Sequence, residues 1–201
     1  MHFRPLIIAS IAVSVGSTAW CPLVQGQWFA QVEVGSDRFW GGSVETTAEH
    51  RSFRPYRPTT FGLGLTRRGA MLGFALRLQY ASASLALEGT DALVAAKGIF
   101  EVYGAAPEVI YRFGTVGANE LLLHGGPLFE LWSLSGDDSQ ARVGVHAAVS
   151  LRVPLGGRFA ASFAAGAALI PSPFTSDQLD QGFERRALWR RRVAGGLEYR
   201  L

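Results

Sequence analysis

The segment LGFALRLQY, residues 72–80, decides how this chain folds. Large apolar side chains alternate in it with small or polar ones at every second position, which is the period of a β-strand. One face carries Leu72, Phe74, Leu76, Leu78 and Tyr80, and the other carries Gly73, Ala75, Arg77 and Gln79. The first face has neither a charge nor a small residue, so the two faces of this strand require different surroundings.

The same alternation recurs along the chain and predicts eight strands. The fifth is less regular, because Leu122 and Leu128 fall on its polar face. The seventh is rich in alanine, so a helix is the alternative there. The predicted strands are approximately residues 28–39, 59–67, 71–80, 103–113, 120–131, 142–153, 159–169 and 189–201.

The connections between these segments alternate in length. Three short turns contain glycine, and they are residues 67–70, 114–119 and 154–158. Between them lie four long loops, which are residues 40–58, 88–98, 133–140 and 171–187. Short turns at one end and longer loops at the other are typical of outer-membrane barrels, in which the turns face the periplasm. An even number of strands then brings both ends of the chain to the periplasmic side.

The last segment alternates up to Leu201. Its apolar face carries Trp189, Val193, Leu197, Tyr199 and Leu201, and its polar face carries Arg190, Arg192, Glu198 and Arg200. A half-apolar strand with an unpaired edge promotes aggregation, whereas pairing of the last strand with the first closes a barrel and leaves no edge. We therefore expect this segment to pair with the one that begins at Trp28.

Residue size indicates which face of the barrel is outside. The polar face is also the small face, with Gly62, Gly64, Gly73, Ala75, Gly104, Ala106, Gly126, Gly144, Ala164, Gly166, Ala194 and Gly196. The interior of an eight-stranded barrel is just wide enough to be filled by its own side chains, which suits small residues mixed with charged ones. The sequence thus predicts an all-β fold, an eight-stranded antiparallel up-and-down transmembrane β-barrel with short periplasmic turns and longer outer loops. A soluble periplasmic lipocalin-like carrier is an alternative that requires the inverse polarity.

Charged side chains on the inward face are expected to form ion pairs, because burial of a lone charge costs free energy. A salt-bridged plug without an open pore is the favoured interpretation, and a proton path or a catalytic cluster is the alternative. His124 and His146 are candidates to join the plug. The predicted interior charge network consists of Glu33, Arg77, Glu108, Arg112, Glu130, Arg152, Arg192, Glu198 and Arg200.

Aromatic residues gather near the ends of the predicted strands, as in the two aromatic girdles of membrane barrels. The group toward the short turns is Trp28, Tyr111, Phe113, Phe159 and Tyr199. The group toward the long loops is Tyr56, Phe61, Tyr80, Tyr103, Trp132 and Trp189.

Residues 1–26 have the features of a secretory signal peptide, which leaves residues 27–201 as one barrel domain. His2 and Arg4 precede an apolar run at residues 6–15 that is too short to span a bilayer. Val24 and Gly26 supply small residues at the −3 and −1 positions of a cleavage site, so cleavage is expected after Gly26. The alternative to a signal peptide is a buried core helix.

Cys21 is the only cysteine. An acylated lipoprotein is an alternative interpretation, but Trp20 occupies the place where a small residue is needed. If cleavage follows Gly26, the mature chain has no cysteine for a disulfide, a thiol nucleophile or a thiolate metal site.

On the signal peptide, the alternation and the terminal segment GGLEYRL, residues 195–201, the chain resembles the small outer-membrane β-barrel proteins, the OmpA/OmpX-like eight-stranded group. The resemblance covers residues 27–201. In that family the last strand is read by the barrel-assembly machinery and usually ends in Phe. The resemblance implies that Leu197, Tyr199 and Leu201 form the assembly signal, with Leu201 in place of Phe. It also implies a monomer in the outer membrane with both termini in the periplasm.

Two relatives in that group are enzymes acting on lipid A, a palmitoyltransferase and a deacylase. The deacylase type uses a His-x-Ser pair with a carboxylate, and neither His124 nor His146 is followed by serine at that spacing. Asp138 and Ser139 resemble the Asp-Ser pair of the palmitoyltransferase, and His50 in another loop completes a conceivable set. Because a Gly-Asp-Asp-Ser segment is typical of a solvated turn, we predict no catalytic residue.

Cofactors and nucleic acid are not expected either. The adjacent Asp137 and Asp138 lack the spacing of a calcium loop, and no glycine-rich phosphate loop or zinc spacing occurs. The basic residues are nearly all arginine, with Lys97 the sole lysine, and they are too dispersed for a nucleic-acid footprint.

Arg51, Arg54 and Arg57 lie in the first predicted long loop and are candidates for contact with phosphorylated lipopolysaccharide headgroups. A solvated basic loop is the alternative. The sequence therefore predicts an outer-membrane barrel of structural or surface-interaction type, with outer-membrane lipid and the barrel-assembly machinery as partners. A lipid A-modifying barrel enzyme is the main alternative.

Overall fold

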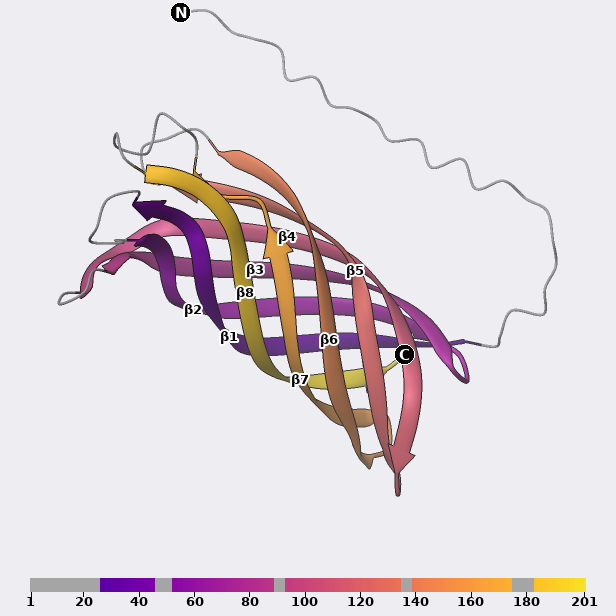
Figure 1. The fold of residues 1–201 in the computed structure, drawn as a ribbon. Coiled ribbons are helices and arrows are strands. Elements are labelled where there is room, and N and C mark those ends of the chain that lie inside the picture. Colours follow the sequence, from indigo (N-terminus) through magenta and orange to yellow (C-terminus); the bar gives the residue numbers. More distant parts are fainter. Residues whose placement is uncertain (1–25, 46–51, 89–92, 135–138, 175–182) are drawn as a thin grey trace, which may run out of the picture.

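The computed structural model describes residues 26–45, 52–88, 93–134, 139–174 and 183–201 (Figure 1). The predicted signal peptide lies outside these residues, apart from Gly26. The described residues contain no helix that is long and apolar enough to cross a membrane. The strands are β1 (Gln27–Glu45), β2 (Ser52–Arg68), β3 (Leu72–Glu88), β4 (Leu93–Val116), β5 (Asn119–Leu134), β6 (Gln140–Gly156), β7 (Phe159–Ile170) and β8 (Phe183–Arg200).

The strands form one closed barrel in which each strand pairs antiparallel with the next along the chain. β1 also pairs with β8, for example at Val32 and Leu197, so no sheet edge remains (Figure 1). This confirms the prediction that the last segment pairs with the first. Residues 69–71, 117–118 and 157–158 connect strands at one end of the barrel, which we call the short-turn end; the opposite end is the long-loop end.

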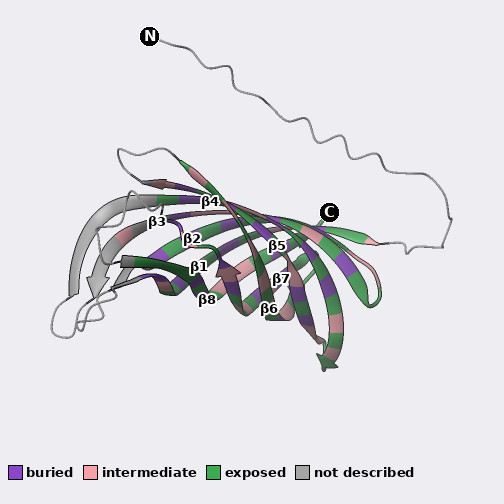
Figure 2. Cartoon of the chain, turned by 45° about the horizontal axis from the view of Figure 1, so that its top comes forward, coloured by how far each residue is buried: buried purple, intermediate pink, exposed green. Residues whose placement is uncertain are grey.

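Burial alternates along the strands, as the bands of colour in Figure 2 show. The large apolar residues face outward, with Val32, Leu63 and Val193 each more than half exposed (54, 60 and 61%). The intervening residues face inward and are buried or half-buried. The predicted polarity is confirmed, and the polarity that a lipocalin-like carrier requires is wrong for this barrel.

β7 is a strand, so the helical alternative for its alanine-rich sequence is wrong. It pairs with β6 and β8 over nearly its whole length, because small side chains fit between two neighbouring strands as well as they fit a helix. The two leucines that blurred the pattern of β5, Leu122 and Leu128, point inward and are buried.

Several predicted loops are shorter than expected, because the strands at the long-loop end continue into them. β1 and β2 occupy most of residues 40–58, which the sequence predicted as a loop. Pro55 and Pro58 caused the error, since proline disfavours a strand interior. Here the pairing of β2 with β3 shifts between Tyr56 and Thr59, and this irregularity accommodates Pro58.

Apolar side chains fill the interior toward the long-loop end. Leu128, Ile170 and Leu188 are fully buried there. Trp132 is also fully buried, and its ring packs edge-on against Phe39 at 6.0 Å between centroids. Its predicted place in the outer aromatic girdle is therefore wrong: Trp132 lies on the inward face of β5, where its indole N–H donates a 2.9 Å hydrogen bond to Glu130 Oε2.

Candidate functional site

Buried charges meet in the middle of the barrel, in a group that we call the central cluster: Glu33, Asp37, Arg77, Glu108, His124, Ser150 and Arg192. The Arg192 Nη2 donates to Glu33 Oε1 at 2.6 Å, and Arg77 Nη2 donates to Glu108 Oε2 at 3.2 Å. Arg77 also lies 3.6 Å from Glu33, so it bridges the two carboxylates. The hydroxyl of Thr60 donates to Asp37 Oδ2 at 2.8 Å.

A glycine on the neighbouring strand makes room for Glu33. A Cβ atom on Gly62, its cross-strand partner, would lie 2.5 Å from the Glu33 Cγ. Real Cβ atoms do not approach a side chain that closely, so a larger residue at this position requires Glu33 to move away from Arg192. The small inward residues thus provide the space in which the long charged ones pair.

Ser150, His124 and Glu108 form a hydrogen-bonded chain. His124 Nε2 lies 2.7 Å from Ser150 Oγ, and His124 Nδ1 lies 3.1 Å from Glu108 Oε2. The order of hydroxyl, imidazole and carboxylate is that of a nucleophile, a base and an orienting acid. All three side chains are buried, and Ser150 does not line the cavity at the short-turn end. The arrangement therefore fits a polar plug in which these three side chains satisfy one another.

Another buried ion pair lies toward the long-loop end. Arg190 Nη1 donates to Glu130 Oε1 at 2.5 Å, and the other oxygen of Glu130 accepts from Trp132. Both charged side chains are almost completely enclosed. Because Glu130 accepts from both Arg190 and Trp132, it connects the polar middle of the barrel to the apolar side chains that pack beside it.

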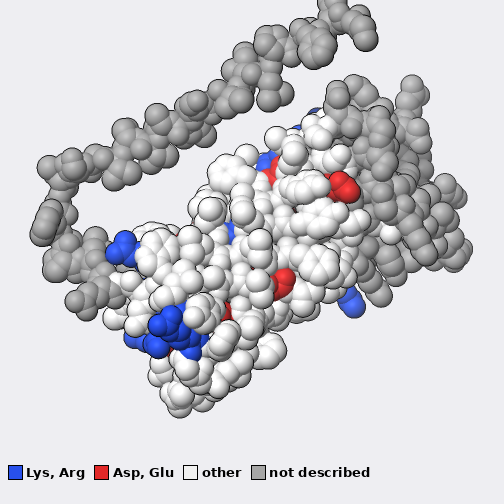
Figure 3. Space-filling view, turned by 180° about the vertical axis from the view of Figure 1, so that it is seen from behind, with Lys and Arg blue, Asp and Glu red and all other residues white. Residues whose placement is uncertain are grey.

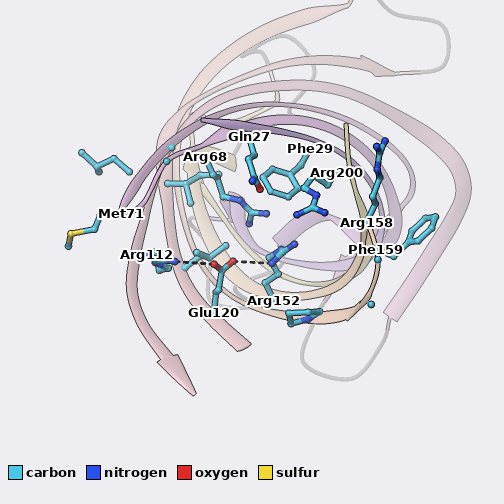
Figure 4. Close-up of a pocket in the computed structure, with 18 residues that line it drawn as sticks. Gln27, Phe29, Arg68, Met71, Arg112, Glu120, Arg152, Arg158, Phe159 and Arg200 are labelled. Atoms are coloured by element: carbon cyan, nitrogen blue, oxygen red, sulfur yellow. Dashed lines mark hydrogen bonds and ion pairs between the residues drawn. The ribbon is translucent and has the colours of Figure 1, made fainter. Parts of the chain in front are cut away.

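A second group of charges, the rim cluster, lies at the short-turn end and consists of Arg68, Arg112, Glu120, Arg152 and Glu198. Glu198 Oε2 accepts from Arg68 at 2.7 Å and from Arg152 at 2.8 Å. The carboxylate of Glu120 accepts from Arg112 and from Arg152, each at 3.2 Å (Figure 4). Arg152 thus joins both acids.

The rim cluster borders a cavity of about 470 Å³ that lies between the short turns and the strand ends. Phe29, Ile110 and Leu122 lie on its inner side and are buried. Arg158 and Arg200 also line it. In the space-filling view, arginine atoms gather at this end, while the wall between the two ends is largely uncharged (Figure 3).

The structure brings most of the predicted charge network together. Eight of its nine members take part in ion pairs, in three groups rather than one: the central cluster, the Arg190–Glu130 pair and the rim cluster. The exception is Arg200, which is exposed at the mouth of the cavity and forms no ion pair with any described residue. What these residues do in the cell stays a prediction.

Sequence reasoning left four members out of the predicted network: Asp37, Ser150, Arg68 and Glu120. Each lies on the inward face of its strand, two or four positions from a predicted member or a small inward residue. Arg68 was assigned to a turn, and Glu120 to the end of a segment. Extending the alternation to the strand ends is the signal that finds these two.

The headgroup candidates are placed differently from the prediction. Arg54 and Arg57 belong to β2 and not to a loop, and Arg51 lies outside the described residues. The proposed assembly residues Leu197, Tyr199 and Leu201 are exposed on the outer wall.

The loop residues that suggested an acyltransferase are only partly visible. Ser139 is exposed, and both Asp138 and His50 lie outside the described residues. Among the residues that the structure does describe, no group of three or more His, Cys, Asp and Glu side chains is placed to hold a metal ion.

Fold, polarity and interior together define the class of protein: a small eight-stranded up-and-down β-barrel with an apolar outer wall and a charged interior, the architecture of outer-membrane barrels. No family model and no curated protein matches the chain.

Solved structures match its fold at low sequence identity. The crystal structure of Neisserial surface protein A (NspA) superposes with a TM-score of 0.62 at 11% identity, over 87% of this chain and 97% of that one. The outer membrane protein AlkL, solved in lipid bilayers, superposes with a TM-score of 0.54 at 11% identity, over 92% and 95% of the two chains. At this identity the similarity concerns the fold.

Proposed function

We propose that this protein is an outer-membrane barrel with a structural or surface-interacting role, closed to ions, with its short turns toward the periplasm. The observation that supports this most is the contrast between the two faces of the strands. The outer wall carries large apolar residues such as Leu63 and Phe74, whereas the inner face carries ion-paired charges such as Arg77 and Glu108. In water this arrangement is unfavourable, and in a bilayer it satisfies both faces.

The length of the strands supports a role in contact at the long-loop end. About 9–11 residues of a tilted strand cross a bilayer, and β4 has 24 residues. The connections at the short-turn end are tight, so most of the surplus length extends the wall at the other end (Figure 1). The extended strands provide a paired surface beyond the membrane, where the sequence predicted the beginning and end of the long loops.

A pair of arginines on the outer wall supports contact with phosphorylated headgroups as part of this proposal. Arg38 and Arg191 are exposed and lie directly opposite each other on β1 and β8. The Arg191 guanidinium lies 4.8 Å from the ring of Trp40, whose cross-strand partner is Trp189. Two like charges side by side are unfavourable without an anion between them. We include lipopolysaccharide contact at this pair, and at Arg51, Arg54 and Arg57, in the proposal.

Two measurements test the proposal. In planar bilayers the folded protein should give no stepwise conductance, and regular steps would contradict a closed interior; heat-modifiable mobility on gels verifies that the sample is folded.

For headgroup contact, the double variant R38Q/R191Q should retain several-fold less lipopolysaccharide than wild type. R67Q, on the outer wall at the opposite end, serves as the matched control, and equal retention by R38Q/R191Q and wild type would exclude this site.

The proposal assigns no reaction to the Ser150–His124–Glu108 chain. Its hydroxyl is enclosed by the barrel wall and by the ion pairs around it. A lipid acyl chain has no described route to it.

A further inference from the structure

The cavity at the short-turn end carries more positive than negative charge. Among the described residues that line it, five are arginines (Arg68, Arg112, Arg152, Arg158 and Arg200) and one, Glu120, is acidic. Glu198 adds a second carboxylate through Arg68 and Arg152. Two carboxylates therefore serve five guanidinium groups, which leaves an excess of three positive charges around one hollow space.

Two of the arginines have no acidic partner among the described residues. The Arg200 side chain has no ion pair or side-chain hydrogen bond, and Arg158 has a single 3.4 Å bond from Nη1 to the Tyr199 hydroxyl. Their backbones are joined, because the Arg200 N–H donates to the Arg158 carbonyl at 2.8 Å. Strand β8 and the turn after β6 thus lie side by side at the mouth of the cavity, and an anion in the cavity would provide the acceptor that Arg200 lacks.

The remaining arginines are already oriented. The guanidinium groups of Arg68 and Arg152 lie 4.1 and 5.2 Å from the ring of Phe29, which is buried on the inner side of the cavity. Both also donate to the same oxygen of Glu198. Figure 4 shows Arg68, Arg152 and Arg200 converging on the enclosed space from different strands. Fixed donors lose little conformational entropy when a ligand binds.

The chemistry of these donors selects a class of ligand. Guanidinium groups bind both carboxylates and phosphates through paired N–H donors. A carboxylate presents its two oxygens in one plane, whereas a phosphoryl group presents oxygens on several sides and can accept from arginines on opposite walls at once. The cavity of about 470 Å³ is large enough for a group of this size together with water. We propose that the cavity at the short-turn end binds a multivalent phosphoryl anion through Arg68, Arg152 and Arg200, with Arg158 at its edge.

Calorimetric titration with pyrophosphate tests this proposal. The full barrel is folded in a maltoside detergent, which contains no phosphate, at low ionic strength, with sodium chloride of equal ionic strength as the reference titrant. Wild type should bind pyrophosphate and not chloride. R200Q should weaken binding about tenfold, because it removes one charge-assisted donor set, and R158Q should weaken it about threefold.

R67Q is the matched control. Arg67 is adjacent to Arg68 in sequence but lies on the outer wall, where its guanidinium is 5.8 Å from the Trp28 ring. It removes the same charge from the same end of the barrel without touching the cavity, so binding should change less than about twofold. Heat-modifiable mobility establishes that each variant is folded, and R158Q carries the test if R200Q does not fold.

A second titration distinguishes the source of the phosphoryl group. Dihexanoyl phosphatidic acid, below its micelle concentration, replaces pyrophosphate. Binding of both ligands, weakened by R200Q, indicates that a free phosphoryl group suffices; binding of the lipid alone, weakened by R200Q, indicates a lipid headgroup. The proposal is overturned if neither ligand binds, or if R200Q and R67Q affect binding equally.

Discussion

The middle of the barrel and its short-turn end contain the same kinds of charged residue, yet they are built differently. In the middle and beside it toward the long-loop end, the enclosed arginines have carboxylates: Arg77 pairs with Glu108, Arg190 with Glu130 and Arg192 with Glu33. The surrounding space is filled, toward the long-loop end, by apolar side chains. At the short-turn end the space is hollow and arginines outnumber acids.

The difference follows from access to water. A buried guanidinium without a partner loses its hydration and gains nothing in return, so the most enclosed arginines of the filled part each have a carboxylate. In a cavity that opens at the end of the barrel, water solvates the unmatched arginines, and the same charges remain available to a ligand. Pairing thus indicates a structural role in the middle, and excess charge indicates a binding role at the end.

The largest expected effect is the loss of a central carboxylate. Glu108→Ala removes the carboxylate that His124 contacts and leaves the buried Arg77 only its 3.6 Å contact with Glu33, which should lower the free energy of unfolding by about 3–5 kcal/mol. The matched variant Glu120→Ala acts on Arg112, whose side chain is 37% exposed, and on Arg152, which keeps Glu198. It should cost less than about 1 kcal/mol. Denaturant unfolding of the barrel in lipid vesicles measures both. Equal losses would show that the two regions do not differ in hydration.

The next effect concerns packing. Leu128→Ala removes a fully buried side chain from the filled part of the interior and should cost about 2–4 kcal/mol, because a void remains. Leu122 is buried to nearly the same extent but borders the cavity at the short-turn end. There the new space merges with an existing cavity, so Leu122→Ala should cost about 1 kcal/mol less than Leu128→Ala. The same unfolding assay compares them, and a larger loss for Leu122→Ala would contradict the assignment of the filled and hollow parts.

A smaller effect is expected for a neutral hydrogen bond in the central cluster. Ser150→Ala removes the 2.7 Å contact to His124 Nε2 and should cost about 0.5–1.5 kcal/mol. The loss is compared with that of Ser162→Ala, which removes the 3.0 Å, part-buried hydrogen bond that Gln31 Nε2 donates. No change in stability on Ser150→Ala would indicate that the hydrogen-bonded chain of Ser150, His124 and Glu108 does not stabilise the fold. A test for acyl transfer would then be worthwhile.

The smallest effect on stability is expected at Arg200. Because this side chain has no ion pair within the described part of the chain, Arg200→Gln should change the free energy of unfolding by less than about 0.5 kcal/mol. Arg190→Gln, which breaks the buried pair with Glu130, is the contrasting variant and should be clearly destabilised. A large loss on Arg200→Gln would place Arg200 among the structural charges after all.

Most of the fold could be predicted from the sequence, and the exceptions have identifiable causes. The alternation in residues 72–80 was sufficient to predict one strand, and its recurrence along the chain was sufficient to predict the number and order of the strands. The prolines at 55 and 58 concealed the extension of β2, since a shifted pairing that accommodates proline leaves no pattern in the sequence. Trp132 was misplaced because an aromatic residue near a strand end suits a girdle and an interior equally well.

The sequence by itself determined the number and order of the strands, the face that most residues take and the closed barrel, because alternation is local and reflects the two environments that every strand separates. The tertiary structure decided which charges meet and where space remains. Glu33 and Arg192 are 159 positions apart, and they pair because β1 lies beside β8 in a particular register. Whether an inward arginine is neutralised or faces a cavity depends on that register and on the volume of side chains from other strands. No local pattern encodes either quantity, since both arise only when the barrel closes.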